Sequence, residues 1–177
     1  MNKSVIAVYV DNKHGVLARI ASMFARRGFN IDSLTVGETE CKEFSRITIS
    51  LSGDSYVKEQ MINQLRKIVN VKKVEVISGD VSITRELALI KVKNDTIKRA
   101  DVLAAVDVYR AKVIDFTNNV IGIEITGDPS KIDAFIEYLM PYEIFEMCRT
   151  GIVAVERGSE TLLSKTNATG IQKNKNN

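Results

Sequence analysis

Alternating apolar and polar positions divide the first half of the chain into short strands and two helices. Residues 5–10, 31–36, 44–51 and 71–77 have strand patterns. The apolar residues after the first strand recur at helical spacing, and Gly28 ends that run as a C-terminal cap. A second helical stripe follows Gly53-Asp54. The order of elements is therefore βαββαβ.

The second half repeats this order, with strands at 87–92, 112–116 and 120–126, helices at 97–109 and 128–140, and a final strand pair between 143 and 155. Leu51-Ser52-Gly53-Asp54 parallels Ile125-Thr126-Gly127-Asp128, which supports a true repeat. In both copies we expect glycine to permit the tight exit from the strand and aspartate to cap the next helix. Pro129 suits the first helical position.

These patterns predict an α+β protein built from two consecutive ferredoxin-like βαββαβ units. The expected boundaries are 1–79 for the first unit, 80–158 for the second and 159–177 for a disordered tail. Each unit has helices on only one face of its sheet and buries a modest core. Because the other face and the edge strands stay open, we expect an oligomer, most simply a homodimer.

Charge is distributed unevenly along the chain. The formal net charge of +3 equals the contribution of Lys165, Lys173 and Lys175, and residues 161–177 contain no acidic residue. The folded part is therefore neutral overall, which argues against binding to nucleic acid. No apolar run is long enough to span a membrane. A strand begins almost at the first residue, so we expect no leader peptide and a cytoplasmic location.

Catalytic and metal-binding patterns are missing from the sequence. The single histidine, His14, has no evident nucleophile or carboxylate partner, and Cys41 and Cys148 do not form a CxxC pair. No phosphate-binding loop, metalloprotease or nucleophile-elbow motif occurs. We therefore expect no catalytic site and no metal site on this chain.

The loop from Asp11 to Leu17 is the first candidate binding site. It joins a strand to a helix, so it presents backbone N–H groups at the positive end of that helix, where a carboxylate can bind. Gly15 would let a ligand approach the backbone, and Asn12 offers both donors and an acceptor. Val16 and Leu17 could line an apolar pocket. The alternative is an ordinary strand-to-helix turn, since Asn and Gly are common there.

Asn30 is the second candidate, at the start of the second predicted strand. In a dimer joined through sheet edges, this strand could reach the first loop of the partner, and Asn30 would complete the site from the other subunit. The alternative is that Asn30 only satisfies the helix exit. The pattern alone does not decide between these interpretations.

Several segments together closely resemble acetolactate (acetohydroxyacid) synthase small subunits, whose N-terminal part is an ACT domain. The first is Asn12-x-x-Gly15-x-Leu17-x-Arg19-Ile20, followed by Phe24-x-x-Arg27-Gly28-x-Asn30-Ile31-x-Ser33-Leu34-Thr35-Val36 and Ser45-Arg46-Ile47-Thr48-Ile49. In the second half, Arg85-Glu86-Leu87-Ala88-Leu89-Ile90-Lys91-Val92, Lys131-Ile132-Asp133-Ala134-Phe135 and Arg149-Thr150-Gly151 are similar to the same family. The resemblance covers residues 3–157.

The resemblance implies a non-catalytic regulatory subunit of a transferase in valine, isoleucine and leucine biosynthesis. Its partner would be a large catalytic subunit that carries thiamine diphosphate, magnesium and FAD and converts pyruvate to 2-acetolactate. The small subunit would activate this enzyme and confer feedback inhibition by valine, with leucine and isoleucine as alternative effectors. The family places the effector between two ACT domains, in contact with Asn12 and Gly15 of one chain and Asn30 of the other. We add Val16, Leu17 and Ile31 as flanking residues.

Two departures from the family and two rival functions complete the expectations. Glu38 stands where many relatives carry Pro, and Glu143 where many carry Gly; we expect neither to touch the effector pocket. One rival is an ACT-domain amino-acid sensor acting on a different partner. The other is a ferredoxin-like RNA-binding module, which would need aromatic residues on its central strands. The strand from Phe44 to Leu51 has none beyond Phe44.

Overall fold

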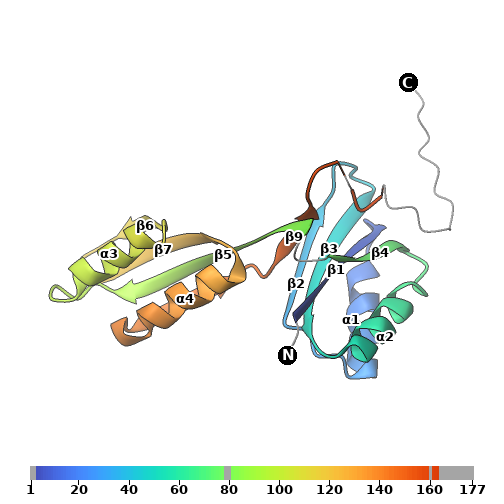
Figure 1. The fold of residues 1–177 in the computed structure, drawn as a ribbon, viewed down its shortest axis with the longest axis horizontal. Helices are drawn as coiled ribbons and strands as arrows, with labels where there is room; N and C mark the ends of the chain where they lie inside the picture. The colour runs from blue at the N-terminus through green and yellow to red at the C-terminus, as the bar shows by residue number, and fades with distance from the viewer. Residues whose placement is uncertain (1–2, 78–80, 160, 164–177) are drawn as a thin grey trace.

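The computed structural model describes residues 3–77, 81–159 and 161–163, and it contains two βαββαβ units joined by a long strand (Figure 1). The first unit comprises β1 (Lys3–Asp11), α1 (Val16–Arg27), β2 (Ser33–Glu38), β3 (Phe44–Ser52), α2 (Ser55–Leu65) and β4 (Val71–Ile77). The second comprises β5 (Ser82–Lys93), α3 (Arg99–Val108), β6 (Lys112–Phe116), β7 (Val120–Gly127), α4 (Pro129–Leu139), the 3-10 turn η2 (Met140–Tyr142), β8 (Ile144–Arg149) and β9 (Val153–Glu156). The predicted fold class is confirmed.

The first sheet has the strand order β2-β3-β1-β4, and all its neighbouring strands are antiparallel. Helices α1 and α2 cover one face, where Ile6, Val8 and Ile49 are buried with Ile20 and Leu65 of the helices. This core fits the alternation of β1 and the 3.6-residue period of α1. Gly28 ends α1 at φ 66° and donates its N–H to Ala25 O, so the predicted cap is confirmed. The order leaves β2 and β4 as edge strands.

The second sheet repeats the first, with the order β6-β7-β5-β8 and antiparallel neighbours throughout. Helices α3 and α4 lie on one face over Ile90, Ile123 and Ile125, and the side chain of Phe135 on α4 is fully buried among them. Figure 1 shows the two units at opposite ends of an elongated molecule.

Strand β5 serves both units. From Glu86 onward it is central in the second sheet, whereas its first residues, Ser82 to Arg85, pair with β9 and not with β7 or β8. The resulting two-stranded ribbon lies against the first sheet, on the face opposite its helices. There Ile152 and Ala154 pack in one cluster with Ala7, Tyr9 and Ile77. The expected final strand pair is therefore present, but its second strand packs on the first unit.

The tail predicted for residues 159–177 falls mostly outside the described residues. Residues 159 and 161–163 are described, and of these Leu162 is buried in the same cluster as Ile152. Within the described ranges, no helix is both long and apolar enough to cross a membrane.

The two expected aspartate caps behave differently. Asp54 caps α2, since its Oδ1 accepts a hydrogen bond from Val57 N at 2.8 Å. The predicted cap by Asp128 is wrong: its side chain makes no capping bond to α4. Instead Oδ1 accepts from Thr84 Oγ1 at 3.1 Å and Arg85 Nη1 at 3.2 Å, because β5 extends far enough to bring these donors beside it.

Candidate effector site

The loop between β1 and α1 leaves the start of the helix uncovered. Gly15 occupies the N-cap position at φ 80° and has no side chain to cap the helix, while the Val16 N–H donates to Lys13 O at 3.4 Å. The first turn of α1 also carries no acidic residue. The partial positive charge of this helix end therefore meets no acidic side chain of its own first turn, which suits it to a carboxylate ligand.

Gly15 also leaves free space in front of this helix end. A Cβ built at Gly15 would meet no atom within 4 Å, so the ligand side of the loop is open. The positive φ is nevertheless a conformation that residues with a side chain rarely adopt. A substitution here adds backbone strain and fills the space where a ligand would approach.

Asn12 fastens this loop to the β2–β3 connection. Its Nδ2 donates to Lys42 O at 2.9 Å and to Glu38 Oε1 at 3.2 Å, while its backbone N donates to Glu43 O at 2.7 Å. Both side-chain bonds use the amide nitrogen, so Oδ1 is the atom suited to accept a bond from a ligand ammonium. The expectation that Glu38 lies away from the site is wrong, because Glu38 contacts Asn12 directly.

Asp11 anchors the other side of the loop to β4. Its carboxylate forms an ion pair with Lys72 Nζ at 3.0 Å and accepts a hydrogen bond from Asn70 Nδ2 at 3.1 Å. Burial alone would raise the pKa of Asp11, but the bonds from Lys72 and Asn70 outweigh it and hold that pKa below its ordinary value. The β1 end of the loop is thus held both to β4 and to the β2–β3 connection.

The apolar residues expected around the effector differ in their exposure. Leu17 is 43% exposed on the first turn of α1, where a ligand at the helix end can contact it. Val16 is only 5% exposed and belongs to the core of the first unit. Ile31 is half-buried and packs against the same core. In one chain, Leu17 is therefore the residue of these three best placed to line a pocket.

Asn12 and Asn30 lie at opposite ends of α1. The helix has 12 residues, so its length alone separates them by about 18 Å. Asn30 is exposed and precedes the edge strand β2. One chain therefore does not bring the two side chains to a common ligand, and the predicted site requires a second copy that pairs near β2.

The remaining candidates for chemistry stand apart from one another. His14 is exposed in the loop, Cys41 is half-buried and Cys148 is exposed, and both thiols are free. Within the described residues, no group of three or more His, Cys, Asp or Glu side chains could hold a metal ion.

The chain has two ferredoxin-like units, and in the first unit a helix begins just after an exposed glycine beside an edge strand. This arrangement is that of the ACT class of regulatory protein. A model of the AHAS small subunit-like ACT domain matches residues 6–73, and a model of the small subunit of acetolactate synthase matches residues 85–158. The chain belongs to the family of acetolactate synthase small subunits.

Individual relatives match over nearly the whole chain. The acetolactate synthase small subunit of Mycolicibacterium smegmatis is 47% identical over 153 residues, which cover 86% of this chain and 90% of that protein. A probable acetolactate synthase small subunit of Archaeoglobus fulgidus is 47% identical over 158 residues, covering 89% and 99%. The crystal structure of the small subunit from Thermotoga maritima is 41% identical, with a TM-score of 0.83 over 90% of this chain and all of that one.

Proposed function

We propose that this chain activates the large catalytic subunit of acetolactate synthase and makes it sensitive to feedback inhibition by valine. In this proposal the chain has no active site of its own. Thiamine diphosphate, magnesium and FAD belong to the catalytic subunit, which condenses pyruvate to 2-acetolactate. Leucine and isoleucine are the alternative effectors, since they share the zwitterion and a branched side chain.

The observation that carries the proposal is the uncapped start of α1 at Gly15, in a member of this family. The effector carboxylate would bind the exposed N–H groups of the first turn. Its ammonium would bind Asn12 Oδ1, and its side chain would lie against Leu17. Asn30 of a second copy, paired through the β2 edge, would close the site. The proposed functional unit is therefore a homodimer with isologous contacts.

A shared site of this kind explains how valine could regulate the enzyme. A ligand shifts an equilibrium only when it binds two arrangements with different affinity. Because the proposed site has one half in each chain, its affinity depends on how the two chains are arranged. A coupling that changes the partner's output by about 5- to 150-fold is typical of allosteric proteins.

Gly15→Asp is the direct test in the enzyme reconstituted with its catalytic subunit. The variant fills the open space and places a negative charge beside the effector carboxylate, so we expect valine sensitivity to be lost while activation persists. Gly158→Asp is the matched control, because Gly158 also has a positive φ of 74° and an added Cβ there would meet no atom within 4 Å. If Gly15→Asp stays as valine-sensitive as the wild type, the site is wrong.

Purification of the chain from its native cells separates the proposal from its rivals. Recovery of a thiamine-dependent catalytic subunit supports it, whereas a different enzyme would indicate another ACT regulator. The RNA-binding alternative is disfavoured by the first sheet, whose non-helical face is covered by β9 and Leu162 and not open to bases.

A further inference from the structure

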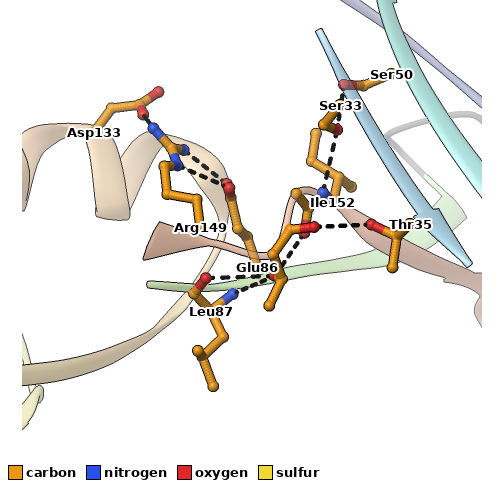
Figure 2. A network of polar contacts seen from close by, with 10 residues as sticks. Ser33, Thr35, Ser50, Glu86, Leu87, Asp133, Arg149 and Ile152 are labelled. Carbon is orange, nitrogen blue, oxygen red and sulfur yellow. Dashed lines mark hydrogen bonds and ion pairs between the residues drawn. The ribbon is translucent and has the colours of Figure 1, made fainter. Parts of the chain in front are cut away.

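We propose that the turn formed by residues 150–152, here named the junction turn, is the connection through which the effector site acts on the second unit. The inference rests on the proposed function and assigns positioning roles to Thr35, Gly151 and Arg149. Figure 2 shows the turn between β2 on one side and the β5–α4 region on the other.

On the side of the first unit, the junction turn contacts β2. Thr35 Oγ1 donates to Thr150 O at 3.0 Å, and Ile152 N donates to Ser33 Oγ at 3.5 Å. Ser33 Oγ is in turn 2.6 Å from Oγ of the buried Ser50 on β3. The turn is thereby attached to the face of an edge strand, which has a strand neighbour on one side only.

Gly151 makes this close approach possible. It has φ 81°, and an added Cβ would lie 2.8 Å from Ser33 Cβ and 3.3 Å from Thr35 Oγ1. Any side chain here would both strain the backbone and push the turn away from β2. A displacement of β2 therefore has to displace the turn as well, because little space separates them.

On the side of the second unit, the same turn is held by hydrogen bonds and an ion pair. Thr150 N donates to Leu87 O at 3.0 Å, and Leu87 N donates to Thr150 Oγ1 at 3.1 Å. Arg149, the residue before the turn, donates to Glu86 from Nε at 2.8 Å and from Nη2 at 2.7 Å, and to Asp133 on α4 from Nη1 at 2.7 Å. The Glu86 side chain is only 5% exposed, so it depends on this pairing.

The effector site and the junction turn meet in β2. Asn30 lies three residues before Ser33, and the Asp32 N–H fixes the intervening segment to Ser50 O at 2.9 Å. If an effector draws Asn30 toward the loop of a second chain, β2 is the element that moves. The contacts of Ser33 with Ile152 and of Thr35 with Thr150 then carry the movement to the junction turn, and Arg149 carries it to β5 and α4. A coupling of two sites needs such an element with more than one arrangement.

Thr35→Val tests the connection with little change in volume. We measure valine affinity by calorimetry on the full chain and residual activity of the reconstituted enzyme at saturating valine. The variant keeps Asn12, Gly15 and Asn30, so we expect valine affinity within about twofold of wild type and inhibition weakened at least about fivefold. Gly151→Ala should weaken inhibition further. Thr84→Val is the control, since it removes another threonine hydroxyl bond, to Asp128, and leaves the hydrogen bonds of the junction turn in place.

A distance measurement makes the test independent of valine. Spin labels at Tyr56→Cys and Val108→Cys, both well exposed, report the separation of the units in a chain whose native cysteines are replaced by serine. We expect a broader distribution in Thr35→Val and Gly151→Ala than in the control. If both variants keep a narrow distribution, the connection is refuted whether or not valine binds.

The two proposals fail in different ways. Full inhibition of both junction variants, in an enzyme whose wild type is inhibited by valine, refutes the connection and leaves the proposed function standing. A wild type that ignores valine refutes the proposed effector. In that case the distance distributions still decide whether the junction turn fixes the second unit relative to the first.

Discussion

The two sheets of this protein have the same strand order but differ in what covers the face opposite their helices. On the first sheet, that face is covered by Ile152, Ala154 and Leu162, which pack with Ala7 and Tyr9. On the second, Leu89 and Ile114 are 40% and 54% exposed. The ion pair Lys91–Glu146 joins β5 to β8, and Lys93–Glu143 joins β5 to the residue just before β8. The first repeat thus has three layers, with its sheet between the helices and the covering segment, whereas the second has only a sheet and its helices.

The difference arises from the chain after β8. Because β5 extends beyond the second sheet, the segment that follows β8 can pair with its free end and lie on the first unit. The apolar residues at the end of the family match therefore stabilise the unit at the beginning of the chain. The sheet of the unit with the candidate effector site is therefore covered on both faces. The connection of this unit to the second unit passes through the same covering segment.

The largest expected effect on stability comes from removing an apolar contact of the segment that covers the first sheet. Ile152 is 5% exposed, so Ile152→Ala should lower the free energy of unfolding by about 3 kcal/mol. Ile114→Ala on the uncovered sheet should change it by less than about 0.5 kcal/mol. Urea denaturation of the two variants measures both values. Equal losses would mean that the two sheets are covered alike in solution.

An intermediate effect on stability is expected from breaking one of two ion pairs, the partly buried pair beside the junction turn or an exposed pair on the second sheet. Arg149→Met leaves the buried Glu86 carboxylate without its partner and should cost about 2 kcal/mol, because Arg149 itself stays partly exposed. Its hydrogen bonds with Glu86 raise the pKa of Arg149 above the ordinary value. Lys91→Met breaks an exposed pair on the second sheet and should leave the melting temperature unchanged. A melting temperature that falls as much in Lys91→Met would contradict this ranking.

The smallest effect concerns the anchor of the candidate loop. The folded-state pKa of Asp11 is lowered, so its stabilisation is present above its unfolded pKa of about 4 and is lost as the pH falls through the folded value. Asp11→Asn should therefore cost about 0.5 kcal/mol at pH 7. Wild type and variant should converge in stability in acid below pH 4. A difference in stability between wild type and variant that grows on acidification would show that folding does not lower the pKa of Asp11.

Much of this architecture could be predicted from periodicity, and the failures have physical causes. β4 and β6 were predicted with their observed bounds, since their patterns end at turns. β5 was predicted too short because Ser82 to Arg85 pair with a strand about 70 residues away, which no local pattern reveals. For the same reason the bonds of Asp128 to Thr84 and Arg85 displaced the expected helix cap.

The candidate site was predicted only in part. The free helix start after Gly15 was expected from the loop residues, because it is a local property, whereas the positive φ of Gly15 was not predicted. The bond between Asn12 and Glu38 spans 26 residues, and the sequence carries no local signal for it. Val16 was expected in the pocket because it is apolar and adjacent, yet the helical period turns it into the core. The part contributed by a second chain stays a prediction.

Mixing two defective variants tests the shared site most directly. Homodimers of Gly15→Asp, and of Asn30→Ala, should each bind no valine, since both of their sites lack one half. After subunit exchange in equal amounts, half of the dimers are mixed, and each mixed dimer has one intact site. Calorimetry should then detect roughly a quarter of the wild-type sites at wild-type affinity. If the mixture binds no more valine than its separate components, Gly15 and Asn30 do not meet across two chains.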